Sequence, residues 1–447
     1  MASLPELFDS AAAFLREHSP ITIVSHIDAD GICATAILEE ALDETGVGFS
    51  ARFIAQASAM AFQRVAQETT GAVAFVDLGS SHLDTISEAF AGRPVLIVDH
   101  HQAQGAAPDA LLCSPVAAGL DGTRVVSAAG LALRVAELIA PGVAKDMAPI
   151  AIVGAHADNQ EPFATINAAI LDDCVARGQV RVRSGARLYG IETKRVLDLV
   201  AYSYDLRIEG VTRDARGAKR LLDGLRIRDP ERRRWKDLSD DEQDALDAEL
   251  LRLSPNPDAR VTHYTIPSMP PGPLRDTREA ATLLNACGRL GQPDVAVMAL
   301  RGDLGALRDA ERVQREYRRA VQDAHRWFQD ARNRGDGDVV VRGELVLIRA
   351  RDHVPPDITG TLCSVLTRGE EVPRGTVVVC VARNADGTGT TKASARAVDS
   401  HADLARVLRD AAAAVGGEGG GHSMAAGAVI PTDAEEEFLR LVQDSLE

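Results

Sequence analysis

The sequence predicts an α/β protein: a parallel, doubly wound sheet in the first part and a smaller mixed α/β domain in the C-terminal part, across a cleft. Two observations predict this fold. Short β-branched runs alternate with helical segments over residues 1–175, and a second mixture of helices and apolar runs follows residue 260. Continuous apolar runs between helices are typical of parallel strands, because helices cover both faces of such a sheet.

Three apolar runs in the first part are the expected strands. Segments with helical spacing accompany them, such as residues 34–42 and 83–90. Each run ends in polar residues, at the edge where sheets of this kind bind ligands. The runs are ITIVS (21–25), VAFVD (73–77) and VLIVD (95–99).

A helical region follows. Residues 196–206 and 217–225 predict short helices, and 228–253 predict a charged helical stretch in which Ser239 is the N-cap and Glu242 lies three residues later. SPNPDA (254–259) is typical of a linker. Further helices are expected at 276–290 and 305–332, and strands within 339–350, 375–384 and 391–398. The expected domains are 1–185, 186–258 and 259–447.

Composition narrows the class of protein. The chain has 447 residues, 45% hydrophobic and 26% charged, as in globular proteins. It contains no run of about 18 apolar residues, so we expect no membrane span. The first residues lack the pattern of a signal peptide. The six cysteines are scattered without a CxxC pair, which favours a reduced, cytoplasmic protein over a disulfide framework or a zinc site.

The charge is unusual for a protein that handles nucleic acid. The net charge is −16, and only five of the 49 basic residues are lysines. An acidic chain that prefers arginine is typical of a halophilic, archaeal cytoplasm. In molar salt the Debye length is about 3 Å, so contacts with a polyanion would have to be local. Aromatic residues make up only 4% of the chain, which leaves few platforms for stacking bases.

The segment SHIDADG is the first candidate site. It places His26, Asp28 and Asp30 at alternate positions after the first strand. If the backbone stays extended, the three side chains point the same way and would repel one another without a cation between them. Asp-rich turns are also common without a metal, so the motif alone is weak evidence.

Repetition strengthens the metal hypothesis. Asp77 ends the second strand run, Asp99-His100-His101 ends the third, and Asp158 follows a further apolar stretch. A lone Asp at a strand end usually caps a helix, but four segments that deliver Asp or His to one edge are harder to explain in that way. Carboxylates with imidazoles suit Mn²⁺, or Mg²⁺ as the alternative. A pair of such ions activates water for attack on phosphorus.

The C-terminal part offers a second set of candidates. Lys392, Ser394 and Arg396 alternate, which places them on one face of a strand and makes a phosphate cradle plausible against the alternative of an ordinary exposed face. The stretch GGEGGGH ends at His422, and its glycines would let the backbone approach a phosphate. The alternative for that stretch is a flexible linker.

These motifs resemble a known family. SHIDADG, VAFVDLG, VDHHQ and GAHAD, in this order, resemble the four motifs of the DHH phosphoesterases, and GGGH resembles the signature of their associated C-terminal domain. Among these enzymes, the motifs are most similar to the archaeal RecJ-like nucleases, including those that associate with the GINS replication complex. The resemblance implies a catalytic domain at 1–185, a connecting insert at 186–258 and a substrate-binding domain at 259–447.

The resemblance also implies residue roles. Two Mn²⁺ ions would be held with Asp77 as the bridge, and His101 would face the phosphate; Asp28 and Asp77 join His101 as the catalytic residues. His156 is expected to be structural. Asn285 and Arg289 are weaker candidates for substrate contact, on a helix that more simply packs its leucines inward. The implied metal ligands are His26, Asp28, Asp30, Asp77, His100 and Asp158, with His26 at a position where the family varies; the implied substrate ligands are Lys392, Ser394, Arg396, Gly420, Gly421 and His422.

The expected activity is removal of nucleotides from an end of single-stranded DNA or RNA, in DNA replication or repair. Two alternatives use the same motifs or fold. One is an oligoribonuclease or cyclic-dinucleotide phosphodiesterase, which acts on short substrates. The other is a replication component that binds GINS, a role that does not exclude catalysis.

Overall fold

The computed structural model describes residues 3–203, 205–335, 337–369, 371–384 and 387–446. Contacts divide the chain into two compact units, Met1–Glu311 and Arg312–Glu447. The long helix α14 (Leu304–Arg334) begins in the first unit and ends in the second. Residues 259–311 pack within the first unit, so this division differs from the domain boundary at 258/259 that we proposed from the sequence.

The first unit is built on the expected parallel sheet. Its strand order is β2-β1-β3-β4-β5, and every pairing in it is parallel. The three predicted runs form its central strands, so the fold class is confirmed for this part. The strands are β1 (Ile21–His26), β2 (Phe49–Ile54), β3 (Ala72–Val76), β4 (Val95–Val98) and β5 (Ala110–Cys113).

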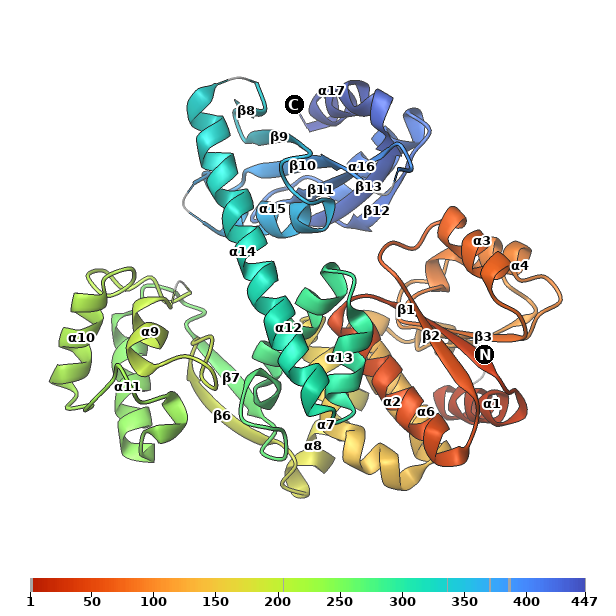
Figure 1. Ribbon diagram of the computed structural model, residues 1–447, viewed down its shortest axis with the longest axis horizontal. Helices are drawn as coiled ribbons and strands as arrows, with labels where there is room; N and C mark the ends of the chain where they lie inside the picture. Colours follow the sequence, from red (N-terminus) through yellow and green to blue (C-terminus); the bar gives the residue numbers. More distant parts are fainter. Residues whose placement is uncertain (1–2, 204, 336, 370, 385–386, 447) are drawn as a thin grey trace. The chain divides into compact units, whose positions relative to one another are not determined.

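Helices cover both faces of this sheet (Figure 1). On one face, α3 (Ala59–Glu68) and α4 (Leu83–Ala89) contribute Phe62 and Ile86 to a core with the strands. On the other, three helices pack against one another, and α2 and α6 also contact the strands. These are α2 (Ala29–Thr45), α6 (Ala128–Ile139) and α7 (Pro141–Ala157).

The middle segment has a hydrophobic core of its own, which extends from Ala186 to Ala259. The antiparallel ribbon of β6 (Arg181–Ala186) and β7 (Arg260–Thr265) flanks it in sequence. Its helices lie next to that ribbon in Figure 1. The predicted capping box is present: Glu242 N donates to Ser239 Oγ at 3.2 Å, and Ser239 N donates to Glu242 Oε2 at 2.8 Å. The helices are α9 (Val196–Ala201), α10 (Ala215–Gly224) and α11 (Asp240–Leu253).

The second unit contains a mixed sheet, as expected. Its strand order is β12-β13-β11-β10-β9-β8, and only the β9–β10 pairing is parallel. α16 (Leu404–Ala414) and α17 (Glu435–Leu446) cover one face, and α15 (Thr359–Arg368) contacts β10 and β11. The strands are β8 (Val339–Arg342), β9 (Leu345–Arg351), β10 (Val377–Arg383), β11 (Thr390–Arg396), β12 (Glu418–His422) and β13 (Ala425–Pro431).

The remaining helices connect these layers. Among the described residues, none of the helices combines the length and the apolar composition that a membrane crossing requires. The α-helices are α1 (Leu4–Glu17), α5 (Gly122–Val125), α8 (Thr165–Ala176), α12 (Thr277–Arg289) and α13 (Pro293–Leu300). The 3₁₀ helices are η1 (Ser80–His82), η2 (Val116–Ala118), η3 (Trp235–Asp237), η4 (Pro273–Arg275), η5 (Pro356–Ile358) and η6 (Thr432–Ala434).

Candidate metal centre

The SHIDADG segment turns from a strand into a helix. His26 is the last residue of β1, Asp28 is the N-cap of α2, and Asp30 lies in the first helical turn. Asp28 accepts a hydrogen bond from Gly31 N at 3.1 Å. A Cβ at Gly31 would lie 2.5 Å from His26 O, so this turn needs glycine. We expected an extended backbone over His26, Asp28 and Asp30. This prediction is wrong beyond Asp28, where the helix begins.

Asp77 follows β3 with a left-handed backbone. Its φ is 60°, and its N–H donates to Val98 O at 3.0 Å. This region is uncommon for residues other than glycine, although Asp tolerates it better than branched residues do. The turn places the Asp77 carboxylate at the carboxyl edge of the sheet, where it is 3% exposed. His100 follows β4 at the same edge, and Asp158 is the C-cap of α7.

The side chains from these segments form three overlapping groups with metal-ligand geometry. The groups are His26, Asp28 and Asp77; Asp30, Asp77, His100 and Asp158; and Asp77, His100 and His101. The structure thus brings all six predicted ligands together, and Asp77 belongs to every group.

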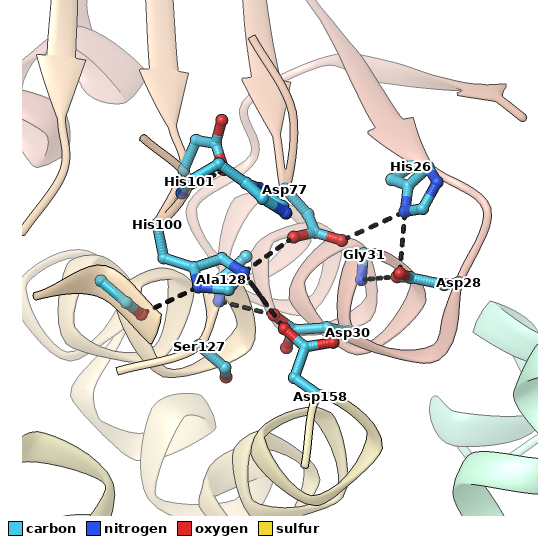
Figure 2. A network of polar contacts seen from close by, with 12 residues as sticks. His26, Asp28, Asp30, Gly31, Asp77, His100, His101, Ser127, Ala128 and Asp158 are labelled. Carbon is cyan, nitrogen blue, oxygen red and sulfur yellow. Dashed lines mark hydrogen bonds and ion pairs between the residues drawn. The ribbon is translucent and has the colours of Figure 1, made fainter. Parts of the chain in front are cut away.

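The two oxygens of Asp77 face different groups (Figure 2). Asp77 Oδ2 lies 3.5 Å from His26 Nδ1, which is itself 2.8 Å from Asp28 Oδ2. Asp77 Oδ1 lies 3.5 Å from His100 Nε2. One carboxylate with an oxygen toward each of two ligand groups has the arrangement that a bridge between two cations requires.

The tautomer of His100 can be inferred from its contacts. Nδ1 lies 3.0 Å from Gly122 O, to which it can only donate, so Nε2 is left to face the carboxylates. Nε2 is 3.1 Å from Asp158, 3.5 Å from Asp77 and 4.0 Å from Asp30. A backbone carbonyl that fixes the outer nitrogen of a histidine is typical of metal ligands.

Two buried atoms test whether a cation fits. Asp77 Oδ1 and His100 Nε2 make no hydrogen bond of acceptable geometry with any residue that the structure describes. Buried polar atoms without partners are rare and require an explanation. Neighbouring ligands of a small divalent ion lie about 3 Å apart when its bonds are about 2.1 Å. The donor set and its spacing therefore fit divalent cations.

The N-terminus of α6 fixes the Asp30 carboxylate. The carboxylate accepts hydrogen bonds from Ala128 N at 2.6 Å and Ala129 N at 3.0 Å, at the N-terminus of α6. Free N–H groups at a helix start favour a negative charge. Gly154 of α7 leaves room for this side chain, because a Cβ there would lie 2.2 Å from Asp30 Oδ1.

Without a metal ion, the buried carboxylates of the centre repel one another. Burial and the charge of Asp28 raise the pKa of Asp77 to about 6. Burial, then the charges of Asp158 and Asp77, raise the pKa of Asp30 well above its usual value. Burial opposes protonation of His100, but the nearby carboxylates of Asp158 and Asp77 outweigh it and raise the pKa of His100. The raised pKa values mean that Asp30, Asp77 and His100 bind protons more readily than usual, because positive charge offsets the clustered carboxylates.

His101 is oriented by Asp99. The Asp99 carboxylate accepts from His101 N at 3.1 Å, lies 2.7 Å from His101 Nδ1, and accepts from Ser80 N at 2.9 Å. Burial opposes ionisation of Asp99, but the hydrogen bond and charge of His101 hold its pKa far below the usual range. His101 Nε2 is left for another partner, and its side chain is 41% exposed. Asp99, Ser80 and Gly154 carried no individual sequence signal for these roles, apart from the position of Asp99 beside two histidines.

Two other candidates have structural contacts. Asn285 Oδ1 accepts from Ala29 N at 3.1 Å, which fixes the first residue of α2 beside Asp28. His156 lies 2.7 Å from Thr277 Oγ1, and burial lowers the pKa of His156 to about 3. His156 belongs to none of the ligand groups found among the described residues.

In the second unit, the predicted substrate residues share a sheet face with one exception. Cross-strand registers place Arg396, Ala425 and His422 in one row, and Ser394, Gly427 and Gly420 in the next. Directly opposed residues lie on the same face. Gly421 is in register with the buried Ala426 and so belongs to the opposite face. The glycine-rich stretch is thus a strand, and the flexible-linker alternative is wrong.

Three of these side chains already have partners. Lys392 Nζ is paired with Asp357 Oδ1 at 2.7 Å, so part of its charge is neutralised. Ser394 is buried and its hydroxyl contacts Thr359 Oγ1 at 2.9 Å. Arg396 Nη1 donates to the carbonyl oxygens of Ala395 and Ala426 at 2.8 and 3.1 Å. These contacts hold the side chains in place before any ligand binds.

Three domain families match the chain in sequence. The N-terminal domain of the DHH family matches residues 20–155, the DHH-CID domain matches 188–260, and the DHHA1 domain matches 343–447. The DHH-CID match covers the helical segment in which the sequence offered no motif. With the parallel sheet and the shared-ligand site, these matches establish that the chain belongs to the DHH family.

Solved structures have the same fold. RecJ of Thermus thermophilus in complex with Mn²⁺ has a TM-score of 0.61 at 17% identity, covering 99% of this chain and 54% of that one. The chain therefore spans about half the length of that RecJ. CDC45 of Entamoeba histolytica has a TM-score of 0.64 at 12% identity, covering 99% and 98% of the two chains. An uncharacterised protein of Methanocaldococcus jannaschii is 22% identical over 448 residues, covering 96% of this chain and 94% of that protein.

Proposed function

We propose that the chain is a phosphodiesterase that requires two Mn²⁺ ions, with Mg²⁺ as a possible substitute, and removes nucleotides from an end of single-stranded DNA or RNA. The observation that carries this proposal is Asp77, whose two oxygens face separate ligand groups 3.5 Å away on either side. The RecJ structures, which contain Mn²⁺ or Mg²⁺, support the choice of ions. A cytoplasmic, halophilic setting is part of the proposal.

The residues of the centre have separate proposed roles in binding the metal ions and the phosphate. When bound, two divalent ions make water nucleophilic at neutral pH and neutralise charge on the phosphate. Asp28 and His26 would hold one ion, Asp30, His100 and Asp158 the other, and Asp77 both. Asp99 keeps His101 Nδ1 occupied at 2.7 Å, which turns Nε2 outward.

His101 would bind a non-bridging phosphate oxygen through the Nε2 proton. Asp99 favours the protonated imidazole, because its charge and hydrogen bond raise the pKa of His101 despite burial. A cationic donor at this position stabilises the negative charge on the phosphoryl oxygens during in-line attack. His101 is thus assigned to the phosphate and not to a metal.

Substrate selection is assigned to the second unit. The row of Ser394, Gly427 and Gly420 presents little side-chain volume, and Arg396 and His422 lie one row away, two strands apart or about 10 Å. Such a face would accommodate a phosphate backbone between two donors. Lys392 would contribute after it exchanges Asp357 for a phosphate.

Two alternatives use the same centre or fold. Hydrolysis restricted to oligonucleotides of a few residues, or to cyclic dinucleotides, would indicate a short-substrate enzyme. Association with a GINS replication complex is favoured by the CDC45-type fold, which extends over 99% of the chain. The second role is compatible with catalysis because the six candidate ligands lie together.

The decisive experiment compares the wild type with Asp77→Asn, using Asp146→Asn on the exposed side of α7 as the matched control. End-labelled DNA and RNA of 5 to 30 nucleotides would be incubated with Mn²⁺ in low and molar KCl. We expect Asp77→Asn to lower hydrolysis by more than about a hundredfold, since loss of a group that only orients a ligand already has effects of about 10- to 100-fold.

Thermal unfolding provides the second readout. Mn²⁺ should raise the unfolding temperature of the wild type and the control, because it binds only the folded site. The shift should be lost in Asp77→Asn. Retained hydrolysis or a retained Mn²⁺ shift in that variant would contradict the bridging assignment, and a wild type inactive on every strand would favour the non-enzymatic role.

A further inference from the structure

The DHH-CID segment carries a local excess of positive charge. Residues 207–236 contain eleven basic and five acidic residues, a net charge of +6 within a chain whose net charge is −16. A basic region in an acidic protein is the electrostatic pattern of a polyanion-binding surface. The catalytic assignments use none of these residues.

Four exposed cations of this segment lie on two short stretches that a single β-bridge joins, and they are here named the basic strip: Arg195, Arg232, Arg234 and Lys236. Arg195 and Arg234 face each other across an antiparallel β-bridge. Like charges in such a pair are unfavourable when nothing neutralises them. Among the residues that the structure describes, no ion pair joins these four side chains to an acidic residue.

The backbone beneath the basic strip is anchored. Between the exposed positions, Arg233 turns inward to Glu242, with a contact of 2.8 Å to Oε1. Trp235 is buried, and the Arg183 guanidinium lies 5.0 Å from its ring. The charges of Arg234 and Lys236 act on the buried Glu192, but no ion pair among the described residues joins Glu192 to either side chain. The strip is therefore held in position with its charges toward solvent.

We propose that the basic strip binds the phosphate backbone of the single strand, beyond the nucleotides held at the metal centre. This inference rests on the proposed function. Arginine and lysine contacts to phosphate are the main source of sequence-independent affinity for nucleic acid. An apolar protein interface is disfavoured, because Tyr202 is the one large hydrophobic side chain exposed among the described residues of 188–260.

Helix α12 connects the strip to the metal centre within the first unit. Glu279 accepts from Glu192 N at 2.8 Å, three residues before Arg195. Asn285, on the same helix, accepts from Ala29 N beside Asp28. Six residues of helix span about 9 Å, so the two regions are neighbours on one rigid element. A strand of several nucleotides could contact both the metal centre and the basic strip. A very short oligonucleotide could contact only one of them.

The test uses the full chain with metal chelated to prevent hydrolysis. The triple variant Arg232→Gln/Arg234→Gln/Lys236→Gln is compared with a matched control, Arg64→Gln/Arg177→Gln/Arg342→Gln, which removes the same charge at exposed positions elsewhere. Fluorescence anisotropy would measure affinity for oligothymidylates of 5 and 30 nucleotides over a range of salt, and circular dichroism would verify folding.

We expect the strip variant to bind the 30-mer at least about tenfold more weakly at low salt. Its slope of log affinity against log salt should fall in magnitude by about 2, since each phosphate contact on a single strand contributes about 0.7. The control should follow the wild type. Equal 30-mer affinity and slope in the strip variant and the control would overturn the proposal.

A separate assay distinguishes this inference from the proposed function. Wild-type hydrolysis of the labelled 5-mer with Mn²⁺ reports on the metal centre alone. If the wild type hydrolyses the 5-mer but the strip variant retains 30-mer binding, the basic strip assignment fails and the phosphodiesterase stands. If the wild type hydrolyses nothing while the strip variant loses 30-mer binding, the enzymatic assignment fails and the surface stands.

Discussion

Asp77 combines two features that residues seldom combine. Its backbone is left-handed, with φ of 60°, and its carboxylate is buried with one oxygen lacking a hydrogen bond of acceptable geometry to the described residues. Each feature is unfavourable by itself. Both are understandable if the carboxylate must stand between His26 and His100 to serve two cations. Strain at this one position then places the ligand that all three groups share.

The pair of Asp99 and His101 leads to a prediction at the residue scale. Asp99→Asn removes the negative charge that orients His101 and raises its pKa. We expect kcat to fall by about 10- to 100-fold with Mn²⁺ affinity nearly unchanged. Because protonated His101 becomes less favoured, activity should decline at a lower pH than in the wild type.

The measurement is kcat against pH, together with a Mn²⁺ titration. Asp109→Asn, an exposed position, controls for loss of one carboxylate. A merely structural role for Asp99 would lower activity uniformly and leave the shape of the pH profile unchanged, which would contradict this assignment.

At this scale the sequence predicts residue types better than contacts. Alternating His26, Asp28 and Asp30 suggested a ligand cluster, and the cluster exists, but Asp28 and Asp30 reach it from a helix start and not from an extended strand. The hydrogen bond from Ala128 N to Asp30 spans 98 positions. No local pattern encodes such a contact, because it depends on how α6 packs.

Among the elements, α7 supplies the clearest packing requirement. A Cβ at Gly154 would lie 2.2 Å from Asp30 Oδ1 and 2.6 Å from Ala129 Cβ. Asp30 cannot move aside, since two N–H groups of α6 hold it. We therefore expect Gly154→Ala to lower the free energy of unfolding by about 1–3 kcal/mol and to weaken Mn²⁺ binding.

Gly142 of the same helix provides the control. No atom lies within 4 Å of the position that its Cβ would occupy. Gly142→Ala should therefore be neutral or stabilise by up to about 1 kcal/mol through helix propensity. Urea unfolding and Mn²⁺ titration check both variants. Equal stability of the two would show that Asp30 and α6 yield more easily than their contacts indicate.

Strands and helices with a clear apolar or capping pattern in the sequence were predictable, whereas the edge strands of the sheets were not. The central strands and the capped helix α11 follow from apolar runs and from the Ser239–Glu242 box. The edge strands β2 and β5 were not predicted, because polar residues interrupt the apolar residues of β2, and the apolar run of β5 is only four residues long. The glycine-rich β12 has hardly any side chains to show a period, and cross-strand pairing with β13 alone makes it a strand.

On the scale of the whole molecule, α12 joins parts of the first unit that are distant in sequence. It contacts Ala29 through Asn285, His156 through Thr277, and Glu192 and Thr193 through Glu279. The sequence placed this helix in the C-terminal domain, whereas contacts group it with the first unit. The two divisions differ because long-range hydrogen bonds, which composition does not encode, join this helix to the first unit.

The buried carboxylate at this junction makes stability depend on pH. Burial raises the pKa of Glu279 to about 7, and burial also raises the pKa of the neighbouring Asp276 to about 6. The folded protein keeps the Glu279 proton up to about pH 7, whereas the unfolded chain releases it near 4.5. Between these values the folded state binds more protons, so the free energy of unfolding falls as pH rises. Glu279 alone accounts for a decline of about 3 kcal/mol at most.

Glu279→Gln should remove that part of the decline. Its amide keeps an oxygen to accept from Glu192 N, and it carries no charge to bury. Urea unfolding at pH 5 and pH 8 would measure the difference, with Glu88→Gln at an exposed position as the control for one lost charge. The variant should lose less stability than the wild type and the control over this range. A variant whose decline equals theirs would show that Glu279 is ionised in the fold, and that Thr193 and the Glu192 N–H already compensate its charge.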